Sequence, residues 1–240
     1  MSVLTLRRLC LACLLGASAM ASAQSLEPTP NSVGTAALER GHFSTALNAW
    51  LKAANQGDAK AQNNMGYMYE RGLGVPQSYS KALHWYRMAA AQGLAQAQFN
   101  IGTLYYYGYG VETNPREAVV WFRQAATQKL PEGEYMLGLA YVQGTGVPKS
   151  LTEGLMWLVR AATQGSLSGQ LMAGQTYLSL SKPDPFKAYV WADIATSRGN
   201  ADASLVRDYA SFKMERDAIE KAAAAAKACL SSNYAQCPEY

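Results

Sequence analysis

The chain has 240 residues, of which 49% are hydrophobic and 16% are charged, and its formal net charge at pH 7 is +4. A chain of this length and hydrophobic content can bury a continuous core. No two basic residues are adjacent after Arg8, which argues against nucleic acid as a partner and against polybasic docking to a membrane surface.

The first 23 residues have the features of a secretory signal peptide. Arg7 and Arg8 precede an apolar run at 9–15, and small residues lead to Ala23, which predicts cleavage after Ala23. The apolar run is too short to span a membrane, although a retained anchor is the alternative interpretation. Cleavage leaves 19 basic against 17 acidic residues. We therefore expect a periplasmic or secreted protein without an integral membrane span, in which residues 24–31 form a short linker.

A repeat with a fixed period dominates the middle of the chain. Gly66 recurs after 36 residues three times in succession, at Gly102, Gly138 and Gly174. Tryptophans recur with the same spacing of 36 residues, except that the last interval is 34: Trp85, Trp121, Trp157 and Trp191. A period in the thirties predicts a stack of similar supersecondary units.

Each unit is predicted to fold as two antiparallel helices. In the first unit, apolar and small residues recur at helical spacing on both sides of the Gly-Val-Pro turn at 74–76. Helix starts are marked by Asn114-Pro115, Asp184-Pro185 and the capping-box pattern Ser150 to Glu153, and helix ends by Gly93, Gly165 and Gly199. Lys129 replaces that final glycine in the second unit, so we expect either mild strain or a different turn there.

Gly66 and its equivalents lie inside a predicted helix, where glycine costs about 0.5–1 kcal/mol relative to alanine. Retaining that cost four times makes sense if two helix backbones pass too closely for a β-carbon. The columns of aromatic residues that begin at Tyr69 and Trp85 recur in the same units. We expect both columns to pack in the core against the small residues.

The pattern A-x-A-Q-x-x-x-G-x-x-Y-x-x-G-x-G-V, followed by K-A-x-x-W-Y-x-x-A-A, resembles the Sel-one-like repeat (SLR), a relative of the tetratricopeptide repeat. The resemblance covers four units, at residues 58–93, 94–129, 130–165 and 166–199. Residues 32–57 resemble a tetratricopeptide-like helix pair in which Trp50 aligns with Tyr86, and residues 200–240 resemble a degenerate last repeat with a capping helix. The resemblance implies an all-α, right-handed α/α superhelix of about five antiparallel helix pairs plus a C-terminal helix. It also implies a surface that binds another protein, and it supplies no catalytic residues.

The first helices of the four units carry a stripe of variable residues at spacing i, i+4, i+7 and i+11. We call this the first-helix stripe: Lys60, Asn64, Tyr67 and Arg71, then Gln96, Asn100, Thr103 and Tyr107, then Glu132, Met136, Leu139 and Gln143, then Ser168, Met172, Gln175 and Ser179. Because first helices line the concave side of such solenoids, the stripe is the candidate groove for a protein or peptide. Ordinary solvated surface is the alternative.

The run Tyr105-Tyr-Tyr-Gly-Tyr109 is the most unusual local feature of the stripe. Tyr105 belongs to the predicted core column, so Tyr106, Tyr107 and Tyr109 are in excess. These three side chains form either a binding hot spot or the packing of the turn.

Cys229 and Cys237 remain after removal of the signal peptide, and an even pair in an exported protein predicts a disulfide. Such a bond would hold the C-terminus against the last helix. A free reactive pair or a metal site is less favoured, because no histidine accompanies the two cysteines. We expect no metal and no cofactor.

Two segments match the S-x-x-K motif of penicillin-recognising enzymes, at Ser78 to Lys81 and at Ser179 to Lys182. The partner motifs S-D-N and K-T-G are missing from the sequence, and we interpret both matches as chance. The sequence therefore predicts a non-catalytic adaptor of the bacterial cell envelope. Two alternatives stay open: a binder or weak hydrolase of β-lactams or cell-wall fragments, and a secreted factor that acts on host cells.

Overall fold

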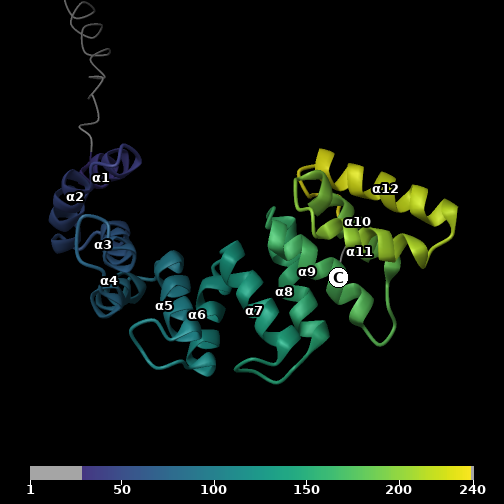
Figure 1. Ribbon diagram of the computed structural model, residues 1–240, viewed down its shortest axis with the longest axis horizontal. Helices are drawn as coiled ribbons and strands as arrows, with labels where there is room; N and C mark the ends of the chain where they lie inside the picture. The colour runs from purple at the N-terminus through teal and green to yellow at the C-terminus, as the bar shows by residue number, and fades with distance from the viewer. Residues whose placement is uncertain (1–28, 239–240) are drawn as a thin grey trace, which may run out of the picture.

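The computed structural model describes residues 29–238, so the predicted signal peptide and most of the predicted linker lie outside the described residues. The described part contains twelve α-helices and no strand (Figure 1). The helices are α1 (Pro30–Glu39), α2 (Phe43–Asn55), α3 (Ala59–Arg71), α4 (Tyr79–Ala91), α5 (Ala95–Tyr107), α6 (Pro115–Thr127), α7 (Pro131–Gln143), α8 (Leu151–Thr163), α9 (Leu167–Ser179), α10 (Pro185–Ser197), α11 (Ala203–Phe212) and α12 (Arg216–Ser231).

Consecutive helices pack side by side, and the resulting row of helix pairs bends into an arch (Figure 1). Five pairs run from α1/α2 to α9/α10, α11 continues the row, and α12 packs against α10. The predicted all-α solenoid is therefore confirmed. The linker expected at 24–31 ends earlier than predicted, because Thr29 caps α1 and Pro30 is already helical.

The glycines of the first two repeats form notches for aromatic side chains, although not for tryptophan, whereas Gly138 faces Leu158 and Gly174 faces Ala188 and Val206. A β-carbon placed on Gly66 would lie 2.5 Å from the ring of Tyr86, and one on Gly102 would lie 2.6 Å from the ring of Phe122. Both rings are completely buried. Each is the residue directly after the repeated tryptophan, and neighbouring residues of a helix point about 100° apart.

The expectation that the tryptophan column forms the core is thus wrong for the first three repeats. Trp85, Trp121 and Trp157 are half-buried, and only Trp191 in the fourth repeat is fully buried. Trp121 Nε1 donates to Glu117 Oε1 (2.9 Å) at the edge of the core. The expected tyrosine column is likewise half-buried at Tyr69, Tyr105 and Tyr141 and buried at Tyr177.

The predicted alignment of Trp50 with Tyr86 is confirmed. Trp50 is 1% exposed, and its indole ring occupies the space that a β-carbon on Gly34 would need. The helix pair α1/α2 therefore packs like a repeat although its sequence differs from the other four.

Helix ends follow the predicted signals closely. The side chains of Asn114, Ser150 and Asp184 each accept a bond from a backbone N–H three residues later. Lys129 has the left-handed φ of 62°, and its N–H donates to Ala126 O (2.9 Å) as that of Gly93 does to Ala90 O. The turn is thus the same as in the other repeats, and Lys129 carries the strain of a left-handed residue that has a β-carbon.

A column of buried polar side chains also recurs every 36 residues: Gln62, Gln98, Glu134 and Gln170. Gln62 Oε1 accepts from Gln92 Nε2 (2.8 Å), and Gln62 Nε2 donates to Ala54 O (3.2 Å). Gln98 accepts the equivalent bond from Gln128 (2.8 Å). Each of these side chains therefore ties a first helix to the end of the second helix in its own repeat, and Gln62 reaches the preceding repeat as well.

Glu134 is the one carboxylate in this column, and it is 1% exposed. Its oxygens accept from Arg160 Nε (3.0 Å) and Gln164 Nε2 (2.5 Å). Burial raises the pKa of Glu134 above 4.5 because removal from water disfavours the charged form, and the Arg160 guanidinium offsets part of this shift. Since the folded pKa exceeds the unfolded one, stability falls as pH rises between the two values.

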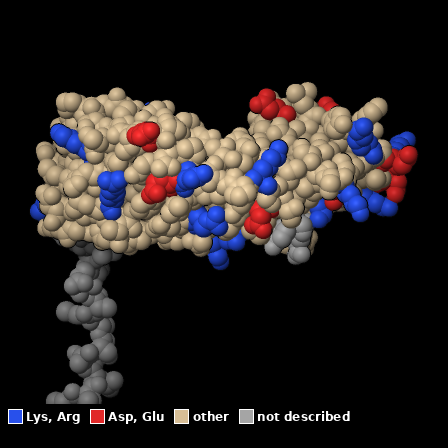
Figure 2. Space-filling view, turned by 90° about the horizontal axis from the view of Figure 1, so that it is seen from below, with Lys and Arg blue, Asp and Glu red and all other residues tan. Residues whose placement is uncertain are grey.

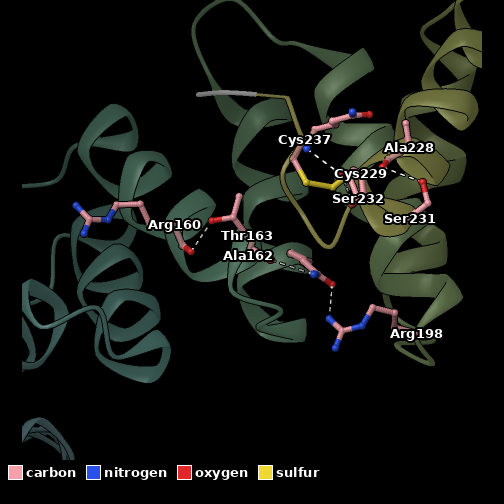
Figure 3. Close-up of a disulfide and its surroundings, with 11 residues drawn as sticks. Arg160, Ala162, Thr163, Arg198, Ala228, Cys229, Ser231, Ser232 and Cys237 are labelled. Atoms are coloured by element: carbon pink, nitrogen blue, oxygen red, sulfur yellow. Dashed lines mark hydrogen bonds between the residues drawn. A yellow bond between two sulfur atoms is a disulfide. The ribbon is translucent and has the colours of Figure 1, made fainter.

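The C-terminal segment returns to the body of the solenoid. A disulfide joins Cys229 of α12 to Cys237, with 4.5 Å between the two Cα atoms. Tyr234, Ala235, Cys237 and Pro238 border the same surface hollow as Arg160 and Thr163 of α8. In Figure 3, Thr163 is drawn nearer the disulfide than Arg160, whose side chain points away from it. The bond expected from the sequence therefore holds the tail against an earlier repeat, and not only against the last helix.

Candidate protein-binding surface

Successive first helices approach one another in the C-terminal half of the arch. α7 approaches α9 directly, and α9 approaches α11, whereas no comparably close approach joins the second helices α4, α6, α8 and α10 in the described part of the chain. In a curved stack, the helices on the inner side are the ones that come closest together. The first helices from α7 onwards therefore lie on the inner side of the arch, and with them the stripe residues of α7 and α9.

Amide side chains link neighbouring first helices in the N-terminal half of the arch. Asn64 Nδ2 of α3 donates to Asn31 Oδ1 of α1 (3.2 Å), and Asn100 Nδ2 of α5 donates to Asn63 Oδ1 of α3 (3.0 Å). Gln96 adds a further bond to Asn100 Oδ1 (3.3 Å). These bonds fix the orientation of several amides in the stripe before any partner binds.

The stripe residues named above differ in exposure. The exposed members are Lys60, Tyr67, Arg71, Tyr107, Glu132, Gln143, Ser168, Gln175 and Ser179. The half-buried members are Asn64, Gln96, Asn100, Thr103, Met136, Leu139 and Met172. Such a row of large, partly covered side chains with a few exposed tips is typical of a surface that can contact an extended partner.

Tyrosines from two turns gather at the end of α5. The rings of Tyr107 and Tyr109 are stacked with 5.4 Å between their centroids, and Tyr109 stacks on Tyr79 of α4 at 5.1 Å. Tyr106 meets Tyr107 edge to face (4.9 Å) and packs against the buried Phe122 (6.3 Å). Tyr106 is thus partly a core residue, while Tyr107 is 55% exposed and Tyr109 is 42% exposed.

The tyrosine cluster continues onto α7 through Tyr135. Burial raises the pKa of the Tyr135 hydroxyl, with smaller contributions from Tyr107 and Tyr106. Met136, the next residue, packs against the hydrophobic cluster around Phe122. The end of α5 and the neighbouring part of α7 therefore carry several aromatic side chains close to one another.

Sequence reasoning missed Tyr79 and Tyr135 as parts of this surface, as well as Asn63. Tyr135 stands four residues before Leu139 and next to Met136, so helical spacing could have indicated that it lies beside these two stripe residues. Tyr79 belongs to the first turn of a second helix, and no spacing rule within one helix places it beside Tyr109.

Charge does not single out a binding site on the face that Figure 2 shows. On the outer side of the arch, seen from below in Figure 2, basic and acidic side chains are mixed.

Among residues 29–238, no three His, Cys, Asp or Glu side chains gather in a way that could hold a metal ion. The helices within the same range are all too short or too polar to cross a membrane.

The serines of the two S-x-x-K segments have structural partners. Ser78 caps α4, where its Oγ accepts from Lys81 N–H (3.4 Å) and lies 3.2 Å from Ser80 Oγ. Lys81 Nζ lies 5.3 Å from the centre of the Tyr69 ring. Ser179 Oγ donates to Gln175 O (2.9 Å). Neither serine is hydrogen-bonded to the lysine side chain of its motif in these positions.

The family model of the Sel1 repeat matches the chain four times, at residues 59–94, 95–130, 131–166 and 168–200. No curated protein is similar enough to the chain to count as a match. A Sel1 repeat protein from Oxalobacter formigenes has a crystal structure that is 34% identical, covers 72% of both chains and gives a TM-score of 0.67.

Two more distant crystal structures share the fold. A protective antigen of uropathogenic Escherichia coli strains with an SLR fold is 24% identical over 80% of this chain and half of its own length, with a TM-score of 0.52. An immunity protein from Pseudomonas aeruginosa is 20% identical over 90% of this chain and 86% of its own length, with a TM-score of 0.53. The four matched repeats together span more than half of the sequence, and the chain belongs to the Sel1 repeat family.

Proposed function

We propose that the protein is an exported, non-catalytic scaffold that binds a protein or peptide along the first-helix stripe. Proteins built from Sel1 repeats are generally protein-interaction scaffolds. The observation that carries the proposal is the preformed surface, on which amides are fixed by hydrogen bonds between helices and tyrosines are stacked on one another. Such a surface loses little conformational entropy when a partner binds.

The proposed partner is an extended protein segment, and not a compact small molecule. The part of the stripe on α3, α5 and α7 runs from Lys60 to Gln143 and offers exposed tyrosine rings beside amide groups. Tyrosine supplies large contact area with few rotatable bonds, and amides donate and accept hydrogen bonds along a peptide backbone.

Export is proposed from the N-terminal sequence, and two structural facts are compatible with it. The disulfide between Cys229 and Cys237 suits an oxidising compartment, and none of the helices in the described range could span a membrane. Fractionation of cells into cytoplasm, periplasm and culture supernatant tests this part. Recovery of the chain in the cytoplasm with residues 1–23 still attached would contradict it.

The binding surface is tested by cross-linked pull-down with the chain from residue 24 onwards. We expect the variant Tyr67→Ala/Tyr107→Ala/Leu139→Ala to lose the partners that the unmodified chain recovers. A matched control changes two similarly exposed apolar residues of the second helices, Met88→Ala and Val120→Ala, and should recover the same partners. If the triple variant recovers them at the same yield, the first-helix stripe is not the binding site.

The β-lactam alternative makes a different prediction. An enzyme that used Ser78 or Ser179 as nucleophile would turn over a β-lactam, and that turnover would disappear in Ser78→Ala or Ser179→Ala. We expect no turnover, because both hydroxyls are engaged in helix capping or helix-backbone bonds.

A further inference from the structure

Helix α11 follows the four repeats in the position of a further first helix, and it exposes a row of large apolar side chains. Leu205 is 74% exposed, Tyr209 is 53% exposed and Phe212 is 82% exposed. Their spacing of i, i+4 and i+7 places them on one face of the helix. Terminal repeats of a solenoid usually have a polar outer face, because nothing covers it.

The spacing of the repeats shows which positions of the earlier first helices correspond to this face of α11. Gly199 ends α10 as Gly165 ends α8, both with left-handed φ, so Leu205 takes the position of Leu171 and Phe212 that of Leu178. The same two positions in the earlier first helices are held by half-buried residues: Phe99 and Tyr106 in α5, and Tyr135 and Val142 in α7.

Those earlier residues are covered by the helices that follow them. Phe99 and Tyr106 pack against a cluster formed by α6 and α7, and Val142 packs against a cluster that includes α8 and α9. On α11 the corresponding side chains have no such cover, because α12 packs against α10. The exposed face of α11 is thus a stacking surface that lacks its next layer.

The charges at the two ends of α11 indicate what could cover it. Asp202 precedes the helix and Lys213 follows it. A separation of eleven residues is three turns plus about 20°, so both side chains lie on the same side of the helix, about 16 Å apart. Lys213 Nζ lies 5.3 Å from the centre of the Tyr209 ring and 5.7 Å from that of Phe212, beside the apolar row.

We propose that this face docks a second copy of the chain, with the two α11 helices antiparallel about a two-fold axis. In that arrangement Asp202 of each copy faces Lys213 of the other, which gives two equivalent ion pairs. Leu205 of each copy then lies between Tyr209 and Phe212 of the other. Arg207 does not compete for Asp202, because it already pairs with Asp193 (3.6 Å) and Asp208 (3.1 Å) of its own chain.

A second copy fits this face better than an unrelated helix because the face is complementary to itself. Helix α11 has an acidic residue at one end and a basic residue at the other, and an antiparallel two-fold contact pairs each with its opposite charge on the second copy. Such a contact gives a closed dimer and does not continue to larger assemblies. The contact is small, so we expect a dissociation constant in the micromolar range. The proposal does not depend on the partner of the first-helix stripe.

The test is sedimentation velocity of the chain from residue 24 onwards, at concentrations from about 1 to about 300 µM. We expect a monomer–dimer equilibrium, and at least a roughly tenfold weaker dimer for Phe212→Glu. The control Val120→Glu changes an apolar residue of α6 that is 49% exposed and should leave the dimer unchanged. Circular dichroism establishes that each variant is folded.

Exchange of the charges tests the orientation. Asp202→Lys alone and Lys213→Asp alone each place like charges opposite each other and should weaken the dimer, whereas the double variant restores two opposite-charge pairs and should regain most of the affinity. A chain that stays monomeric at every concentration overturns the proposal. So does a dimer that Phe212→Glu leaves intact, or one whose charge-exchanged double variant is as weak as the single variants.

Discussion

Replacing Gly66 by alanine tests the packing of the notches directly. Alanine is the better helix former by about 1 kcal/mol, so propensity alone predicts stabilisation. The structure predicts the opposite sign, because the new β-carbon would lie 2.5 Å from two ring atoms of the fully buried Tyr86. Overpacking of this kind costs about 1–3 kcal/mol, and subtracting the propensity gain of about 1 kcal/mol leaves a net destabilisation of up to about 2 kcal/mol.

The measurement is urea unfolding followed by circular dichroism, for Gly66→Ala, Tyr86→Ala and the double variant. Removal of the Tyr86 ring opens the space that the methyl group needs, so Gly66→Ala should become favourable in that background. The two effects of Gly66→Ala should therefore differ by about 2 kcal/mol or more. Gly174→Ala is the milder comparison, because its β-carbon would lie 3.1 Å from the backbone oxygen of Ala188 and 3.3 Å from Val206, and it would meet no aromatic ring. If Gly66→Ala stabilises the chain in both backgrounds, the notch interpretation is refuted.

Three further changes follow from the fold. Glu134→Gln should flatten the loss of stability with rising pH above 4.5, because an amide there carries no raised pKa; urea unfolding at several pH values measures the slope. Lys129→Gly should stabilise the chain by about 0.5–1 kcal/mol because it relieves a left-handed residue, and Gly93→Ala should do the reverse in thermal unfolding. Changing Cys229 and Cys237 to alanine should cost about 2–3 kcal/mol, the chain entropy of a nine-residue loop, measured by urea unfolding.

Each of these has an outcome that would contradict it. An unchanged pH slope in Glu134→Gln would mean that the buried carboxyl titrates as it does in the unfolded chain. A destabilised Lys129→Gly would mean that the lysine side chain contributes more than its backbone costs. Equal stability with and without the disulfide would mean that the tail adds nothing to the packing on α8.

The repeat phasing and the helix pairs were predictable because both depend on local chemistry. Glycine at a left-handed position, proline in the first turn and a capping side chain before it act within a few residues, and Gly93, Asn114 and Asp184 behave accordingly. The disulfide was predictable for a similar reason, since Cys229 and Cys237 are the pair that remains after the predicted cleavage.

The identity of the residue in each notch was harder to predict. Trp85 is repeated without change in the later units, whereas the residue after it is tyrosine, then phenylalanine, then leucine. An invariant column suggests a core, yet the variable one is buried, because the glycine that faces it accepts several shapes. The burial of the column that begins at Gln62 was also not predicted. Gln62 is next to the small Ala61, at the edge of the apolar face, and this position could have indicated it.

The surface was the least predictable part. The stripe could be derived from helical spacing, but Tyr79 and Asn63 come into contact with it only through the packing of one repeat on the next. The side chains that meet across two helices depend on the distance between the helices. This distance cannot be derived from the spacing of residues within one helix.

The constant spacing of 36 residues in the column of buried polar side chains has a consequence for how such a chain can change in length. A complete unit of 36 residues, added or removed, brings each notch and each buried amide back to an equivalent partner. A single residue inserted within α5 would turn everything after it by about 100° and point Gly102 and Gln98 away from their partners. Growth by whole units is therefore open to this architecture, while small insertions are tolerated only in the turns between its helices.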